Sequence, residues 1–143
     1  MLNPISIIRR CEQNYIRNRV DSYHLHPMEA LTLCILYRTG ECNQDALCVE
    51  MNVDKGRIAK TVSSLEDRGY LERSVNPVNK REKQLRLTKP GTEMALTVNK
   101  IFADWNALCF SGFTQEEQDQ YMAFIDRIAH NAAESRKEFR QHD

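Results

Sequence analysis

The sequence predicts a mainly α-helical (α+β) fold, in which two short helices and a two-stranded hairpin lie between longer helices at both ends of the chain. Apolar residues recur at helical spacing before residue 38 and again after residue 91. Between residues 43 and 69, two helical segments with capping residues are separated by a tight turn. Residues 70–87 then form two strand-like runs around a turn that contains proline and asparagine. This order is the plan of a winged helix-turn-helix.

The N-terminal part should form two helices. The first is expected from Asn3-Pro4 to about Val20, because proline is tolerated in the first turn of a helix. The second should begin at Pro27 and end at Gly40, since glycine readily takes the backbone conformation of a helix C-terminus. It is dense in apolar residues, and we expect it to be buried on most sides. The apolar stripe of the first helix consists of Ile5, Ile8, Cys11, Tyr15 and Ile16.

The central part should form the helix-turn-helix itself. Asn43 is suited to cap a short helix from Gln44 to about Met51. Asp54 is suited to cap the second helix, which Gly69 should end. The inward side of this second helix should carry Val53, Ile58, Val62 and Leu65.

A two-stranded hairpin should follow the second of these helices. Its strands are expected at Tyr70 to Val75 and at Lys83 to Leu87, where apolar and polar residues alternate. The connecting residues 76–82 contain Pro77 and two asparagines, which favour a turn. We call this connection the wing.

The C-terminal part should form two further helices. Thr88 is a suitable cap for a long helix that continues to about Cys109. Thr114 should start the last helix, because Glu117 stands where it completes a capping box. The polar tail from Glu134 is expected to fray.

Charge is balanced over the whole chain but not along it. The 143 residues, enough for one domain with a core of its own, contain 20 Lys and Arg and 20 Asp and Glu. Residues 54–91 hold ten Lys or Arg and five acids, a net charge of +5, so the remainder carries −5. A locally basic element in a neutral chain is typical of binding to a polyanion such as double-stranded DNA.

Other classes of protein find little support in the sequence. No apolar run approaches the roughly 18 residues that a membrane span needs, and the N-terminus lacks the pattern of a signal peptide, so we expect a cytoplasmic protein with no membrane partner. The five cysteines are scattered without a CxxC motif, which favours free thiols. We find no phosphate loop, nucleophile elbow or HExxH motif, and therefore expect neither an enzyme nor a cofactor.

Two segments carry a resemblance to a known family. NQDALCVEMNVDKGRIAKTVSSLEDRGYLER, followed by NPVNKREKQLRLTKPG, resembles the MarR family of bacterial transcription regulators, and the resemblance covers essentially the whole chain. Its most specific parts are LEDRGYLER and the wing leading into LRLTKPG. The resemblance implies a sequence-specific DNA-binding transcription regulator, most simply a repressor, that works as a homodimer and can be released by a small-molecule effector.

The dimer gives each part of the chain an expected role. Residues 1–27 would form the N-terminal dimerisation helix and its connection, 28–90 the DNA-binding lobe, and 91–143 the C-terminal dimerisation helices, all within one compact chain. The apolar stripes of the terminal helices agree with this, because the helix-turn-helix offers them no partner and exposed apolar patches usually mark association. The competing interpretation folds the same stripes back into a monomeric core.

The DNA contacts follow from the position of the second helix and the wing. Two copies of the helix would enter successive major grooves about one turn apart, which predicts a pseudo-palindromic operator. Arg57 and Lys60 can donate to guanine edges, and Gly56 permits close approach of the backbone. Thr61 and Ser64 can donate to phosphates. The expected contacts are Lys55, Gly56, Arg57, Lys60, Thr61 and Ser64 in the major groove, and Lys80, Arg81 and Lys83 on the wing; for each cation the competing interpretation is a solvated surface residue.

The wing departs from the family pattern at its tip. Family wings commonly carry Asp-Arg-Arg or Asp-x-Arg there, whereas this chain has Asn79-Lys80-Arg81. The asparagine cannot form the salt bridge of the usual aspartate, although it can accept a hydrogen bond. By resemblance, Arg81 is the residue that would enter the minor groove, where narrow A·T tracts concentrate negative potential.

The sequence contains three candidate sites through which a signal could regulate DNA binding. Tyr15, Tyr37, Phe102 and Trp105 are candidates for an effector cleft for a small aromatic or anionic ligand, with plain core packing as the competing interpretation. Cys11 is the candidate for a thiol-redox switch, because peroxide sensors of the family use a cysteine of the first helix; it lies too late in the chain to match that position. A zinc site at His24, His26 and His130 lacks further ligands at suitable spacing, so we expect no metal.

A rival interpretation is a winged helix that binds protein instead of DNA. Such a module should present an acidic or apolar second helix. Lys55, Arg57 and Lys60 speak against it.

Overall fold

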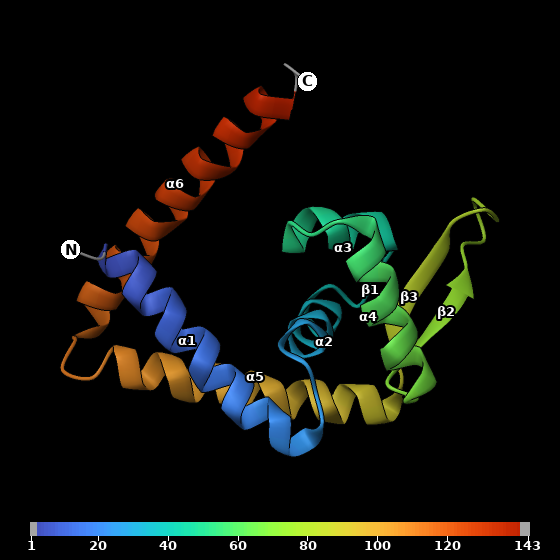
Figure 1. The fold of residues 1–143 in the computed structure, drawn as a ribbon, viewed down its shortest axis with the longest axis horizontal. Helices are drawn as coiled ribbons and strands as arrows, with labels where there is room; N and C mark the ends of the chain where they lie inside the picture. The colour runs from blue at the N-terminus through green and yellow to red at the C-terminus, as the bar shows by residue number, and fades with distance from the viewer. Residues whose placement is uncertain (1–2, 141–143) are drawn as a thin grey trace. The chain divides into compact units, whose positions relative to one another are not determined.

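The computed structural model describes the backbone of residues 3–140 and the side chains of residues 3–135. The chain divides into two units, residues 1–105 and residues 106–143. Figure 1 shows the elements in chain order. They are α1 (Pro4–Val20), the short 3-10 helix η1 (Asp21–Tyr23), α2 (Pro27–Thr39), β1 (Glu41–Cys42), α3 (Gln44–Met51), α4 (Lys55–Asp67), β2 (Leu71–Val75), β3 (Lys83–Leu87), α5 (Lys89–Cys109) and α6 (Gln115–Arg140).

The predicted helix starts are confirmed by their caps. Asn43 accepts a hydrogen bond from the amide of Ala46 at the start of α3. Thr88 accepts one from the amide of Gly91 in α5. Thr114 and Glu117 form the reciprocal pair of a capping box at α6. Side chains at these positions satisfy backbone N–H groups that the helix itself leaves unpaired. In the tail that we expect to fray, α6 continues as helix as far as Arg140, and residues 141–143 lie outside the described residues.

The sheet contains one strand more than predicted. The β2–β3 hairpin pairs antiparallel from Leu71 opposite Leu87 to Val75 opposite Lys83, which confirms the two-stranded wing. The short strand β1 pairs with the other edge of β3, so the strand order is β1-β3-β2. A strand of two residues is too short to show an alternating pattern, and the sequence therefore gave no sign of it.

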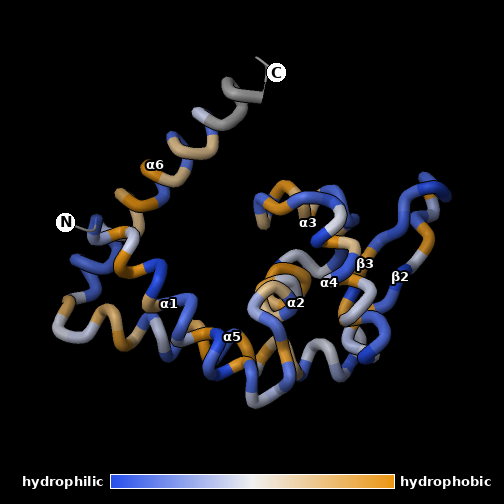
Figure 2. The backbone as a smooth tube through the Cα atoms, in the orientation of Figure 1, coloured by the Kyte–Doolittle hydropathy of each residue, from blue (hydrophilic) through white to orange (hydrophobic). Residues whose placement is uncertain are grey.

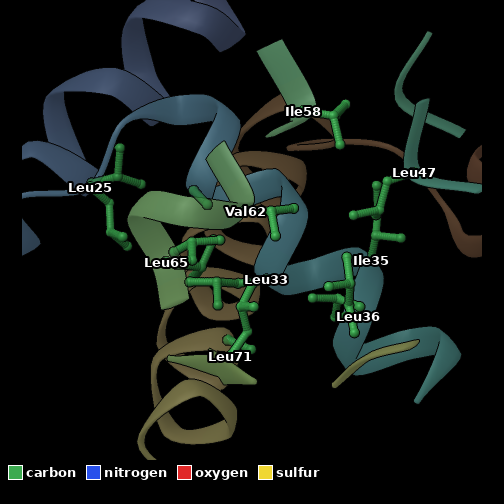
Figure 3. Packing of buried hydrophobic residues seen from close by; sticks show 14 of the residues in the cluster. Leu25, Leu33, Ile35, Leu36, Leu47, Ile58, Val62, Leu65 and Leu71 are labelled. Atoms are coloured by element: carbon green, nitrogen blue, oxygen red, sulfur yellow. The ribbon is translucent and has the colours of Figure 1, made fainter. Parts of the chain in front are cut away.

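The core of the first unit surrounds α2. In Figure 1, α2 lies between α1 and α4, and the β2–β3 hairpin extends beyond α4. Leu33 and Leu36 of α2 are fully buried, together with Ile58, Val62 and Leu65 of α4. Figure 3 shows these side chains converging with Leu47 of α3 and Leu71 of β2. Because each such side chain contributes roughly 1.5–3 kcal/mol when buried, this contact fixes which side of α4 faces the solvent.

The start of α5 lies directly against the start of the hairpin. A Cβ atom on Gly91 would lie 1.7 Å from the carbonyl oxygen of Tyr70, so only glycine fits there. The Thr88 hydroxyl also donates to the carbonyl of Gly69. These contacts join the residues between α4 and β2 to the start of α5.

Large apolar side chains stay exposed on the terminal helices. Ile5 and Ile8 of α1 are exposed, and so are Phe124 and Ile128 of α6. No described side chain of α6 is buried in the single chain, and Figure 2 shows hydrophobic residues recurring along this helix. Within the described residues, no helix is both long and apolar enough to cross a membrane.

Candidate nucleic-acid interface

The outer face of α4 is set by the burial of its inner face. Since Ile58, Val62 and Leu65 point into the core, residues on the opposite side of the helix follow at intervals of three or four. A shallow groove of about 520 Å³ runs along this outer side. Its lining residues are Ala59, Lys60, Ser63, Ser64, Asp67 and Arg68.

The first turn of α4 presents the predicted cations and the glycine. Asp54 accepts a hydrogen bond from the amide of Arg57 at 2.9 Å, which caps the helix as predicted. Lys55, Gly56, Arg57 and Lys60 are all exposed. Apart from a contact of its would-be Cβ with the Asp54 carboxylate, Gly56 has open space around it. The backbone of this turn is therefore accessible to a ligand.

Not every cation of the lobe is equally available. Lys55 forms an ion pair with Asp45 of α3, and the hydrogen bond between them raises the pKa of Lys55. Within the part of the chain that the structure describes, Arg57, Lys60 and the three wing cations form no ion pair. The unpaired wing cations are Lys80, Arg81 and Lys83, all exposed.

The two hydroxyls predicted to donate to phosphates are engaged inside the protein. Thr61 is 8% exposed, and its hydroxyl donates to the carbonyl of Arg57 at 2.9 Å. The Ser64 hydroxyl donates to a carboxylate oxygen of Glu29 at 2.5 Å. The exposed hydroxyl on this side of the helix belongs to Ser63. Ser63 was not among the predicted contacts, although its spacing of three residues from Lys60 places it on the same face.

The wing has an ordered turn at the position where the family aspartate is replaced. The Asn79 side chain accepts a hydrogen bond from the amide of Arg81 at 3.2 Å, so the predicted acceptor role is confirmed. Asn76 accepts a bond from the amide of Val78 at 2.9 Å. Val78 is 95% exposed. The tip thus carries Lys80 and Arg81 on a turn that local side chains define.

The base of the wing faces the start of α3. A cavity of about 490 Å³ lies there, lined by residues of α3 and of the hairpin. Arg73 of β2 crosses to Gln44 of α3 at 2.9 Å and to Glu66 of α4 at 3.2 Å. Glu82 accepts hydrogen bonds from the side chains of Asn43 and Asn76. None of these partners was predicted: Asn43 with Glu82 and Gln44 with Arg73 are 39 and 29 residues apart, and the nearer pairs lie in different elements or at opposite ends of the wing.

A buried carboxylate connects the other end of α4 to the connection between α1 and α2. Glu29 is 7% exposed and accepts bonds from the Ser64 hydroxyl and from the His26 amide at 2.8 Å. Arg68 approaches it at 3.4 Å and also donates to the carbonyls of His24 and Tyr23 at 2.8 and 3.0 Å. Charge-assisted bonds of this kind hold the C-terminal end of α4 against the connection.

The structure brings some of the four predicted effector-cleft residues together. Tyr15 and Trp105 contact each other with ring centroids 5.1 Å apart, and the Arg19 guanidinium lies 3.5 Å over the Tyr15 ring. Phe102 is half-buried against the core. Tyr37 is 44% exposed, and among the described residues it makes no ring contact with the other three.

The thiols and histidines lie in separate environments. Cys11 is exposed on α1, whereas burial raises the pKa of the Cys34 thiol to about 11. Burial also raises the pKa of Cys42. His26 is the N-cap of α2, with its ring accepting from the amide of Met28. Within residues 3–135, no three His, Cys, Asp or Glu side chains are grouped as a metal site.

Comparison with known proteins gives consistent matches. The MarR family matches residues 25–83. The HTH-type transcriptional regulator BilQ of Clostridioides difficile (strain CD3) is 34% identical over 74 residues, which span 52% of this chain and only half of that relative. A crystal structure of MarR matches with a TM-score of 0.79 and 31% identity, and the match covers 94% of this chain and 91% of that one.

A further solved structure resembles the fold at lower identity. It is a putative MarR family transcriptional regulator from Listeria monocytogenes, complexed with 26mer DNA. The TM-score is 0.87 at 20% identity, with 94% of this chain and 92% of that chain covered. At this identity the likeness concerns the fold.

Proposed function

The chain belongs to the MarR family of transcription regulators, which are not enzymes, and from this premise we propose that it is a repressor that binds a pseudo-palindromic operator as a homodimer. The observation that carries the proposal is the set of exposed, unpaired cations on α4 and on the wing. Arg57 and Lys60 stand on the exposed turns of one helix, and Arg81 stands at the tip of the adjacent hairpin. Cations without an internal partner keep their full charge available to phosphates and base edges.

On this proposal each element has a separate task. The outer side of α4 enters the major groove, where Arg57 and Lys60 read base edges. Gly56 lets the backbone approach the DNA, and Ser63 takes the role of phosphate donor that we had expected of Thr61 and Ser64. Arg81 reaches the minor groove from the wing. A Listeria protein of similar fold was solved in complex with 26mer DNA, which supports DNA binding as the general function of this fold.

The homodimer is proposed from the apolar residues that the single chain leaves exposed. Ile5 and Ile8 on α1, and Phe124 and Ile128 on α6, lie at helical spacing on their own helices and are exposed in the single chain. Two copies that bury such faces together would also set the distance between two recognition helices. Sedimentation equilibrium should give twice the 16.7 kDa of one chain. A monomer at micromolar concentration would overturn this part of the proposal.

The proposed effector is a small aromatic or anionic compound bound beside Tyr15 and Trp105. The ring contact between them and the guanidinium of Arg19 combine an aromatic surface with a cation, which suits such a compound. Binding there would shift α1 relative to α5 and so change the spacing of the two lobes. Salicylate is a simple probe: it should weaken operator binding by the native protein and not by a Trp105→Ala variant.

Selection of DNA from a random pool tests the central proposal. The purified protein should enrich a pseudo-palindrome, and binding should weaken as salt rises. Arg81→Ala should lower operator affinity by about 5- to 150-fold, corresponding to 1–3 kcal/mol, without unfolding the protein. Lys60→Ala should also reduce the preference for the selected sequence. Lys100→Ala on α5, where the lysine pairs with Asp104, is the control and should bind normally.

The outcome also separates DNA binding from the rival function. A protein-interaction module would enrich no sequence and would show no salt-dependent complex with DNA. An effect of Lys60→Ala that is equal for all sequences would assign that lysine to a phosphate.

A further inference from the structure

We propose that Glu82 is the positioning residue of the wing: it fastens the wing to the start of α3 and so holds Arg81 at a fixed place relative to α4. The inference rests on the proposed DNA-binding function. Glu82 is an acid that directly follows Arg81 on a strongly basic hairpin. Its charge alone would repel DNA, so its presence there calls for a structural reason.

Both oxygens of the Glu82 carboxylate are engaged. Oε1 accepts a hydrogen bond from the side-chain amide of Asn43, and Oε2 accepts one from Asn76 at 3.2 Å. Main-chain bonds complete the loop: the amide of Asn76 donates to the carbonyl of Glu82, and the amide of Glu82 donates to the carbonyl of Asn79, both at 3.0 Å. The carboxylate therefore joins the two ends of the wing to each other and to α3.

The partner on α3 has two functions at once. The Oδ1 atom of Asn43 accepts from the amide of Ala46 at 2.7 Å and caps α3, while its Nδ2 atom donates to Glu82. A second polar contact supports the hairpin nearer its base, where Arg73 reaches Gln44 and Glu66. The hairpin as a whole, wing included, is thus connected to both helices of the helix-turn-helix.

Polar contacts carry this task because apolar packing is missing at the wing. Val75 is 59% exposed and Val78 is 95% exposed, and a cavity of about 490 Å³ is lined by residues of both the hairpin and the start of α3. The hairpin packs on the core only nearer its base, through Leu71 and Leu85. Among the described residues, its far end has no buried apolar side chain to hold it in one orientation. Only molecules whose wing has the binding-competent orientation can place Arg81 in the minor groove. The apparent affinity for DNA therefore falls as the fraction of such molecules falls.

We call the hydrogen bond between the Asn43 side-chain amide and the Glu82 carboxylate the clamp. The substitution Asn43→Ser tests it without changing any charge. Serine keeps the side-chain oxygen that caps α3, but it has no amide to donate to Glu82. The probe is a duplex of about 30 base pairs, long enough for two half-sites one turn apart, that carries the sequence the native protein selects. We expect operator affinity to fall by about five- to tenfold, within the range of coupled contacts. Urea unfolding should stay close to that of the native protein.

The decisive measurement repeats the substitution without the wing arginine. If Asn43 acts through Arg81, Asn43→Ser should cost no further affinity in an Arg81→Ala background, because the contact that it positions is already lost. An equal loss in both backgrounds would show that Asn43 acts through α3, and the clamp would be overturned. Unchanged affinity of Asn43→Ser alone would overturn it as well.

The sign of the effect at Glu82 gives an independent test. Glu82→Ala should weaken operator binding although it removes a negative charge. The control is Glu72→Ala on the same hairpin, where the acid pairs only with Arg86 across the strands; this variant should bind equally well or more tightly. If both variants bind more tightly, Glu82 is only a repelling charge and the proposal is wrong.

Hydrogen exchange tests the clamp in the absence of DNA. In Asn43→Ser, the amides of Asn76 and Glu82 should exchange faster than in the native protein, while those of β3 beyond Leu85 keep their protection. Unchanged exchange at the wing would contradict the clamp. If the native protein selects no DNA, the proposed function fails on its own, and the exchange data still decide whether the wing is held.

Discussion

Lys55 at the start of α4 forms an ion pair with Asp45 near the start of α3, with 3.0 Å between the ammonium nitrogen and the carboxylate oxygen. Both side chains are largely exposed, so the pair contributes little to the stability of the fold. It instead holds one cation of the recognition helix on an internal partner. A phosphate would therefore compete with Asp45 for the ammonium group of Lys55.

The first prediction concerns this competition. Asp45→Asn should raise affinity for DNA of any sequence, because it frees Lys55 and removes an acid from the DNA-binding side. If Lys55 then reaches a phosphate, the slope of log affinity against log salt should steepen by about one unit. Fluorescence anisotropy at several salt concentrations measures both. Asp104→Asn, which breaks the similar Lys100–Asp104 pair on α5, is the matched control; an equal gain there would contradict the local explanation.

Gly56→Ala separates folding from DNA binding. The added Cβ atom would meet only the Asp54 carboxylate, at 3.3 Å, and alanine favours a helix over glycine by about 1 kcal/mol. Stability in urea should therefore change by no more than about 1 kcal/mol. Operator affinity should fall by about tenfold, if the backbone approaches DNA closely at this turn. Native affinity in the variant would mean that the first turn of α4 stands away from the DNA.

Arg68→Ala should destabilise the fold far more than a typical surface change. It removes the cation beside the buried Glu29 and leaves the carbonyls of Tyr23 and His24 without their donor. We expect a loss of about 2–4 kcal/mol, somewhat below the range for a fully buried pair. Urea denaturation at fixed protein concentration measures it.

The control for this prediction is Arg86→Ala. Arg86 pairs with Glu72 on the exposed side of the hairpin, and such surface pairs contribute less than about 1 kcal/mol. Similar losses in the two variants would show that Glu29 does not depend on Arg68.

Cys34 should be unreactive near neutral pH. Burial raises the pKa of its thiol from 9.0 to about 11, so almost no thiolate is present to react at about pH 8. Because the thiol ionises more readily in the unfolded chain, its contribution to stability is complete below about pH 9 and is lost as the pH rises through 11. Alkylation followed by mass spectrometry should label exposed Cys11 before Cys34. Faster labelling of Cys34 would contradict its burial.

The helices and their boundaries could be predicted well because their signals are local. Asn43, Asp54 and Thr88 each cap the helix that follows them within three residues. The burial of Ile58, Val62 and Leu65 also follows directly from their spacing. Once the inner side of α4 is known, the outer side is known too, and the exposure of Lys60 and Arg57 could be predicted with it.

The partners of polar side chains could not be predicted in the same way. Nothing in the sequence near Glu82 indicates that its carboxylate meets Asn43, 39 residues away. Thr61 and Ser64 have hydroxyl groups that could donate to phosphates. In the structure these hydroxyls donate instead to the carbonyl of Arg57 and to the carboxylate of Glu29. A hydroxyl can donate in several directions, and only packed neighbours decide which one it takes.

The sequence by itself therefore determined the order of the α-helices and the hairpin, the family resemblance and the basic character of the helix-turn-helix and wing. These depend on periodicity, capping and local charge, which act over a few residues. Tertiary structure alone decided which cations stay unpaired, which hydroxyls are internal and what holds the wing. Those outcomes depend on contacts such as Lys55 with Asp45 and Glu29 with Arg68, which exist only after distant segments have packed together.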